Sequence, residues 1–234
     1  MTTQQNGNAL WMILIAIALI GALTAMFSRS STTSDNTGDT ERLAIGANEV
    51  IRYAKSIELA VQNLQGRGCS ENELSFATDH PGAPDYTNSR APDNGSCDLF
   101  KPSGAGLTFQ PLRTGHFTAA APDAGRPVFT VAYNVKATNS ADSDLLLVFN
   151  NLTKNICLAV NRQLGIANPD GDAPEDVATV GAIDYAKGGF NGALADALGD
   201  DAGEHLAART AGCVKRIEVP STPVYQYFHV LIDR

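Results

Sequence analysis

The stretch ALWMILIAIALIGALTAMF, residues 9–27, decides how this chain is organised. Its 19 consecutive residues carry no charge, and Thr24 is the one weakly polar member. An α-helix of that length spans about 28 Å, close to the roughly 30 Å hydrocarbon core of a bilayer. The stretch therefore predicts a single membrane-spanning helix near the N-terminus, followed by an external domain of about 200 residues.

Two other interpretations of this stretch fit less well. A cleavable secretory signal needs basic residues ahead of a shorter apolar run. The preceding residues, MTTQQNGN, contain neither Lys nor Arg, and LTAM is a poor cleavage site. A buried core helix rarely lacks polar residues over such a length. Arg29 argues weakly for the opposite orientation, so the cysteines and the composition carry the expectation that the C-terminal domain lies outside the cytoplasm.

Charge and cysteine content narrow the class of protein. The formal net charge is -8, and no run of basic residues is present, which disfavours nucleic acid as a partner. The four cysteines form no Cys-x-x-Cys pair and have no His at zinc-ligand spacing. An even number of cysteines in an exported domain favours two disulfides over four buried thiols. Of the three pairings, we favour Cys69–Cys97 and Cys157–Cys213, because each closes a polar, Gly- and Pro-rich stretch against a structured element.

A short polar leader ending in glycine (TTQQNG), then an apolar helix, then an amphipathic helix, resembles type IV pilins and pseudopilins. The resemblance covers residues 1 to about 65. It implies that a prepilin peptidase cuts after Gly7 and leaves Asn8 as the new N-terminus. It also implies that the helix is held in the bacterial inner membrane and then packs against other pilin subunits in an extracellular or periplasmic filament. The residues expected in this membrane and filament core include Leu10, Trp11, Ile13, Ile15, Leu19, Gly21 and Phe27.

The chain departs from the family pattern at two positions and in its leader, which lacks the usual basic residues. Asn8 stands where family members usually have an aromatic residue or Met, and Met12 stands where they have a Glu. The Glu implied by the resemblance would pair with a neighbouring N-terminus inside the apolar bundle. Some minor subunits lack it, so Met12 favours a minor over a major subunit.

The remaining sequence predicts an α+β domain in which a long N-terminal helix packs on an antiparallel sheet. The expected divisions are a leader at 1–7, the apolar helix at 8–28, a polar linker or helix kink at 29–40 and an extracytoplasmic pilin-like domain at 41–234. Residues 41–64 repeat apolar side chains at helical spacing, with Asp39 or Thr40 as the cap and Gly66 to Gly68 as the stop.

Further elements follow from shorter patterns. Residues 70–126 are rich in Pro, Gly, Asp and Asn, and predict an irregular excursion with one or two short strands. Strands are expected at 127–135, 144–149, 217–219 and 224–232, with Phe129, Val131, Tyr133 and Val135 on one face of the first. Helices are expected at 152–164, capped by Asn150 or Asn151, and around 193–208.

Residues with catalytic or metal-binding chemistry are sparse. There is no phosphate-binding loop, GxSxG or HExxH motif, and the four histidines (His80, His116, His205 and His229) are scattered. One acidic loop offers oxygen ligands that suit Ca²⁺: Asn168, Asp170, Asp172, Glu175 and Asp176. Ala173 replaces the glycine such loops need, and no Glu closes the loop, so a solvated acidic turn is the favoured interpretation. No cofactor is otherwise expected.

Three functions are compatible with these features. The first is a structural subunit of a type IV pilus-like or type II secretion-like filament, which performs no chemistry. The second is a singly anchored envelope protein whose disulfide-stapled domain binds a partner or carbohydrate without polymerising. The third, an anchored hydrolase using His116 or His229, is the least favoured.

Overall fold

The computed structural model is an α+β chain that divides into two compact units, Met1–Leu43 and Ala44–Arg234. The side chains of residues 7–10, 23, 25–37, 217, 218 and 222 lie outside the description. The residues described are 7–118, 125–138, 140–176, 185–190, 192, 197–199, 205–206, 209–218 and 222–234.

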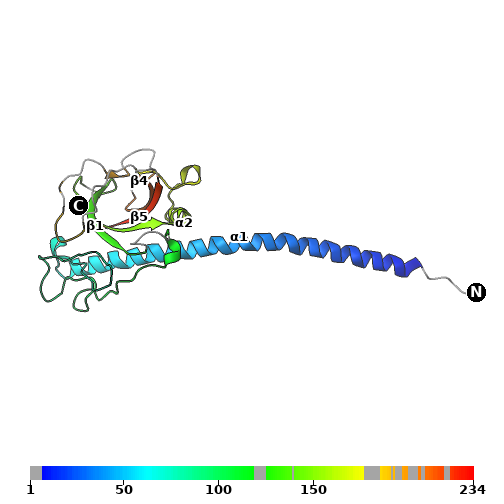
Figure 1. The fold of residues 1–234 in the computed structure, drawn as a ribbon, viewed down its shortest axis with the longest axis horizontal. Coiled ribbons are helices and arrows are strands. Elements are labelled where there is room, and N and C mark those ends of the chain that lie inside the picture. Colours follow the sequence, from blue (N-terminus) through cyan, green and yellow to red (C-terminus); the bar gives the residue numbers. More distant parts are fainter. Residues whose placement is uncertain are drawn as a thin grey trace, which may run out of the picture. The chain divides into compact units, whose positions relative to one another are not determined.

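Helix α1 extends from Gly7 to Gly66, a length of 60 residues (Figure 1). It continues through residues 29–40, where a melted linker and a new helix starting at Glu41 were alternatives. No proline interrupts this stretch, and each polar residue costs a helix only a few tenths of a kcal/mol relative to Ala, with about 1 kcal/mol for Gly. These costs are small enough for a continuous helix.

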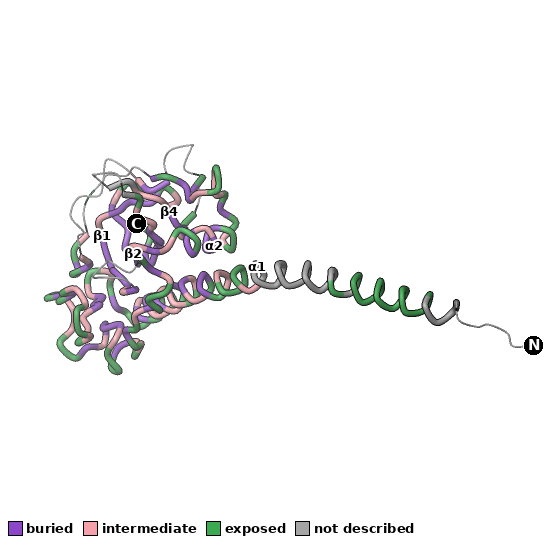
Figure 2. The backbone as a smooth tube through the Cα atoms, turned by 45° about the vertical axis from the view of Figure 1, so that its right-hand side comes forward, coloured by how far each residue is buried: buried purple, intermediate pink, exposed green. Residues whose placement is uncertain are grey.

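Within the second unit, one face of α1 forms the spine of the core. Of the apolar stripe that the helical spacing predicted, Leu43 and Ile51 are half-buried. The other six residues are fully buried (Figure 2): Ala47, Val50, Ala54, Ile57, Val61 and Leu64. The helix ends where expected, because Gly68 adopts φ 97° and lets the Cys69 amide donate back to the Leu64 carbonyl at 3.1 Å.

The sheet contains five strands in the order β3-β1-β2-β5-β4. Strand β2 is central, as predicted, and its neighbours are antiparallel to it. Strand β3 is parallel to β1, so the sheet is mixed and the expectation of an antiparallel sheet was wrong at this edge. The strands are β1 (Val128–Val135), β2 (Asp144–Leu152), β3 (Ala197–Leu198), β4 (Ala211–Glu218) and β5 (Thr222–Ile232).

An irregularity in β1 overturns the prediction that its alternate residues share one face. Phe129 pairs with Leu147, but the register shifts by one residue between Thr130 and Tyr133. An inserted residue moves every later side chain to the opposite face of a strand. Tyr133 therefore joins the main core cluster with Val128, whereas Phe129 stacks on Phe76 with ring centroids 4.3 Å apart.

Helix α2 begins later than predicted. It spans Lys154–Leu164 with Thr153 as its N-cap, while Asn150 and Asn151 belong to β2. The strand continues this far because Leu152 still pairs with Tyr225 of β5. The prediction of a helix around 193–208 is wrong at Ala197–Leu198, which form β3. Residues 193–196, 200–204, 207 and 208 of the predicted helix lie outside the described residues.

The loop layer, residues 70–118, contains scattered backbone hydrogen bonds and a disulfide in place of the short strands that were expected. Its described residues form two 3₁₀ turns, Glu71–Glu73 and Thr114–His116, and isolated bridges. Both predicted disulfides are confirmed: Cys69–Cys97, with Cα atoms 5.8 Å apart, and Cys157–Cys213, at 5.4 Å. The Cys69–Cys97 disulfide joins this layer to the end of α1, and the Cys157–Cys213 disulfide joins α2 to β4.

Candidate functional site

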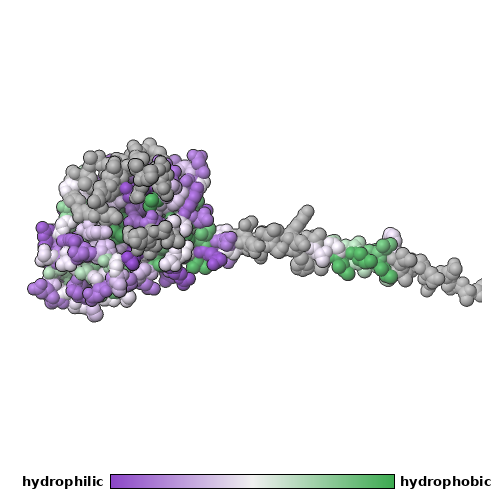
Figure 3. Space-filling view, in the orientation of Figure 1, coloured by the Kyte–Doolittle hydropathy of each residue, from purple (hydrophilic) through white to green (hydrophobic). Residues whose placement is uncertain are grey.

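The apolar surface of α1 is the strongest candidate for function in the first unit (Figure 3). Its large side chains are between 45% and 73% exposed, although ordinary globular domains bury such residues. Gly21 lies in the helix, and an added Cβ there would meet no atom within 4 Å. The apolar surface of α1 comprises Trp11, Met12, Ile13, Leu14, Ile15, Ile17, Leu19 and Ile20.

This surface surrounds the helix. Successive residues of an α-helix are about 100° apart, so apolar side chains at nearly every position from 11 to 20 cover the full circumference. The part of α1 in the second unit differs. One stripe of residues 44–66 is buried, and the other faces are half-buried or exposed (Figure 2). A helix that is apolar all round is stable only where other helices or lipid cover every side.

Some residues assigned to this site from the sequence lie beyond what the structure describes. The side chains of Gly7, Asn8, Leu10 and Phe27 fall in that group, and so do residues 1–6 of the leader. The described residues include no helix with both the length and the apolar character needed to cross a membrane.

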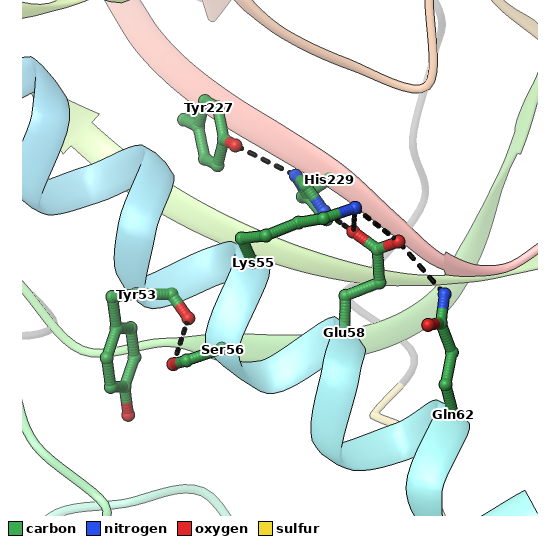
Figure 4. Close-up of polar contacts among 7 residues, drawn as sticks. All are labelled: Tyr53, Lys55, Ser56, Glu58, Gln62, Tyr227 and His229. Atoms are coloured by element: carbon green, nitrogen blue, oxygen red, sulfur yellow. Dashed lines mark hydrogen bonds and ion pairs between the residues drawn. The ribbon is translucent and has the colours of Figure 1, made fainter.

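A buried polar cluster joins α1 to β5 in the second unit (Figure 4). The Nε2 atom of His229 lies 2.6 Å from Oε2 of Glu58, and its Nδ1 atom lies 2.9 Å from the Tyr227 hydroxyl. Lys55 donates to both Glu58 oxygens at 2.7 Å. An ionised carboxylate only accepts hydrogen bonds, so Nε2 carries the proton and Nδ1 accepts from Tyr227. This arrangement satisfies a neutral imidazole on both nitrogens.

The pKa shifts in the cluster favour the same protonation state. Burial lowers the pKa of His229 below its ordinary 6.5, and the attraction of Glu58 only partly opposes this. Burial also acts to raise the pKa of Glu58, but hydrogen bonds from Lys55 and His229 outweigh it and hold that pKa below 4.5. Burial raises the pKa of Tyr227 strongly. The cluster therefore contains one ion pair, Glu58 with Lys55. His229 and Tyr227, which contact it, are neutral.

Acidification is expected to destabilise the second unit through His229. Below the ordinary pKa of 6.5 the unfolded chain binds a proton that folded His229 does not, so the free energy of unfolding falls as the pH drops through this range. Urea unfolding at about pH 7.5 and about pH 5.5 measures the loss. His229→Gln should reduce it, whereas His205→Asn, an exposed control at φ 54°, should leave it unchanged. Equal losses in both variants would contradict this role for His229.

The structure does not gather the scattered histidines into one site. His116 binds Glu49, with Nε2 and Oε2 3.2 Å apart, while His205 is exposed. His80 packs against Phe109, with ring centroids 5.0 Å apart. His116 and His229 thus bind separate glutamates, and neither has a cysteine to activate, because all four cysteines are in disulfides.

The acidic loop uses its oxygen atoms on internal partners. Asp172 lies 3.4 Å from the Lys154 ammonium and accepts from the Tyr225 hydroxyl at 3.0 Å, and Glu175 lies 2.9 Å from Lys215. Asn168 binds Asn161, while Asp176 is buried and accepts from the Gly199 amide at 3.2 Å. Across the described part of the chain, no three His, Cys, Asp or Glu residues are placed to hold a metal ion. Lysines pair with two of the five candidate ligands, Asp172 and Glu175, and Asp170 is exposed.

Sequence patterns did not reveal the Glu58–His229 pair, whose residues are 171 positions apart. The available signals were a glutamate next to the apolar stripe of a helix and a histidine in an alternating strand. Of the two candidate regions, the polar cluster fixes α1 on the sheet, whereas the apolar surface of α1 offers contact area without charge. No family model, curated protein or solved structure matches the chain.

Proposed function

We propose that the chain is a structural subunit of a type IV pilin-like or pseudopilin-like filament, in a minor more than a major role. It assembles through the apolar surface of α1 and performs no chemical reaction. The inner membrane covers this helix before assembly, and equivalent helices of other subunits cover it afterwards.

The exposed apolar surface of α1 carries this proposal. Covering one large apolar side chain contributes about 1.5–3 kcal/mol, and eight such side chains are exposed on successive turns. No single flat partner covers a helix that is apolar on every side, but a bundle of similar helices does. The absence of charge from residues 9–27 also suits a lipid environment before assembly.

The second unit is suited to serve as the outer part of such a subunit. The amphipathic half of α1 packs against the sheet. Two disulfides stabilise the domain, and disulfides form and persist in an oxidising environment outside the cytoplasm. Met12, 73% exposed, leaves the apolar surface without the carboxylate that the family pattern implies. A subunit lacking that pairing group would add less readily along a polymer, which favours a minor position.

A matched pair of substitutions on the same helix tests the proposal. Ile17→Glu places a charge in the surface that other helices or lipid would cover, which costs several kcal/mol. Ile45→Glu makes the same change at a residue of nearly equal exposure, 64% against 62%, on the amphipathic half. We expect Ile17→Glu to lower the amount of subunit recovered in sheared surface fibres more than about tenfold, and Ile45→Glu to leave it within about twofold of the unaltered chain.

N-terminal sequencing separates the filament from a plain anchor. A mature chain beginning at Asn8 and recovered in fibres supports the proposal. An intact Met1 with membrane-bound protein that never enters fibres favours a singly anchored envelope protein, the alternative suggested by Met12. A monomeric, freely water-soluble chain that retains residues 8–28 contradicts both.

A further inference from the structure

The loop layer contains a recess of about 330 Å³, near the lower end of the range for small-molecule sites. It lies in the second unit. Segments 77–80, 100–101 and 107–109 line it. The residues that bear on its chemistry are Asp79, His80, Phe100, Lys101, Thr108 and Phe109.

The walls of this recess are held together by backbone hydrogen bonds. The Leu99 amide donates to the Ser75 carbonyl at 2.9 Å, and the Leu107 amide donates to the Leu99 carbonyl at 3.1 Å. The Cys69–Cys97 disulfide anchors the same segment. At Gly104 an added Cβ would lie 1.8 Å from the Asp98 carbonyl oxygen, so only glycine permits the turn between the second and third walls. A site fixed in this way loses little conformational entropy when a ligand binds.

Within the described part of the chain, one polar group of the recess is unsatisfied, and a second one has no partner. Nδ1 of His80 is buried and has no hydrogen-bond partner among the residues described. A buried polar atom without a partner is rare in native proteins and often indicates a missing water or ligand. Asp79 is exposed and forms no hydrogen bond or ion pair within the described ranges.

The apolar and charged groups restrict the ligand class. Phe100 and Phe109 meet edge to face at 5.3 Å, and His80 lies 5.0 Å from Phe109, which gives the recess an aromatic side. The Lys101 ammonium is 3.1 Å from Asp98, so it is already paired. An anionic ligand would meet the Asp79 carboxylate. The Lys101 ammonium, paired with Asp98, repels a cation only weakly, so a cation is the competing ligand class. A neutral ligand with several hydroxyl groups and an apolar C–H face suits the recess, because its O–H groups donate to Asp79 and its C–H face packs on the aromatic side.

We propose that this recess binds a neutral hexopyranose unit of a carbohydrate. The sugar's C–H face packs on the aromatic side, and its hydroxyl groups donate to Asp79 and bind the His80 imidazole. Thr108 and Lys101 complete the polar rim. The recess has room for a single ring, so binding is weak per site and gains strength only when many copies are presented together.

Saturation-transfer NMR on the full chain, in a detergent without a sugar headgroup, tests the site. The probes are methyl glycosides of glucose, galactose, mannose and N-acetylglucosamine, with tetramethylammonium and inorganic phosphate as charged comparisons. We expect at least one glycoside to bind with a millimolar dissociation constant. Asp79→Asn and His80→Phe should each weaken it about tenfold, since each removes hydrogen bonds to a charged or buried group.

Asp93→Asn is the matched control, because Asp93 is exposed in the same loop layer outside the recess. Its affinity should equal that of the unaltered chain, and near-ultraviolet circular dichroism should show that all three variants are folded. Binding by none of the four glycosides would overturn the proposal. Unchanged affinity in both recess variants, or tighter binding of a charged probe at the same residues, would overturn it as well.

Discussion

Replacing Cys157 and Cys213 together with alanine is expected to lower the free energy of unfolding of the second unit by about 4 kcal/mol. The disulfide joins residues 56 positions apart, and in the loop-entropy model a longer loop restricts the unfolded chain more. Both cysteines are fully buried, so alanine leaves a small cavity without adding a polar group. A domain of ordinary stability, about 5–15 kcal/mol, would lose a large part of it.

The Cys69→Ala/Cys97→Ala double variant is the matched comparison. Its loop is half as long, with a separation of 28 residues, so the expected loss is slightly smaller, about 3.6 kcal/mol. Near-ultraviolet circular dichroism is a suitable readout because Tyr86 and Tyr227 are buried in the second unit, whereas the single Trp is at position 11. A loss below about 1 kcal/mol in either double variant would show that the unfolded chain is not restricted in this way.

Features that depend on local spacing could be predicted from the sequence. The stripe from Leu43 to Leu64 is visible because helical neighbours are three or four residues apart. Six of its eight residues are buried, and Leu43 and Ile51 are half-buried. The alternation in β5 likewise places Tyr227 and His229 toward α1 (Figure 4), and Phe228 in the main core cluster. The uncharged run at 9–27 indicated an apolar helix for the same reason.

Features that depend on distant partners could not be predicted. The shift in β1 arises where Tyr133 pairs with Asp144, and no local pattern marks that insertion. Asp144 is fully buried and accepts from the Val135 amide at 2.8 Å and from the Arg234 amide at 3.0 Å, although it reads as the polar start of a strand. Burial raises its pKa despite these bonds.

The candidate site divides in the same way. The apolar surface of α1 is a property of consecutive residues and was predicted. The recess needs three segments brought together by backbone hydrogen bonds, and its orphan nitrogen on His80 exists only in the folded chain. The ion pairs of the acidic loop could not be predicted either, because Lys154 and Lys215, which pair with Asp172 and Glu175, lie on other elements.

Asn161→Leu is expected to destabilise the second unit by about 3 kcal/mol, although Leu keeps the same branched side-chain skeleton and has a better helix propensity. Asn161 is fully buried in α2. Its Oδ1 accepts from the Cys213 amide at 2.9 Å, and its Nδ2 donates to the Cys213 carbonyl at 2.8 Å. The side chain thereby pairs with the outer edge of β4 as another strand would, next to the Cys157–Cys213 disulfide.

Leucine at position 161 would leave the Cys213 N–H and C=O buried without partners, and each such group costs about 1–3 kcal/mol. It would also remove the hydrogen bond that the Asn168 Oδ1 accepts from Asn161 at 3.0 Å, leaving Asn168 held by its donation to the Leu158 carbonyl at 3.1 Å. The matched control is Asn155→Leu, the same change at an exposed position of the same helix, expected within about 0.5 kcal/mol of the unaltered chain. Urea unfolding of both variants measures the difference. Equal urea midpoints would mean that water binds the Cys213 N–H and C=O once Asn161 is replaced. The Asn161 side chain would then not be needed to satisfy the β4 edge.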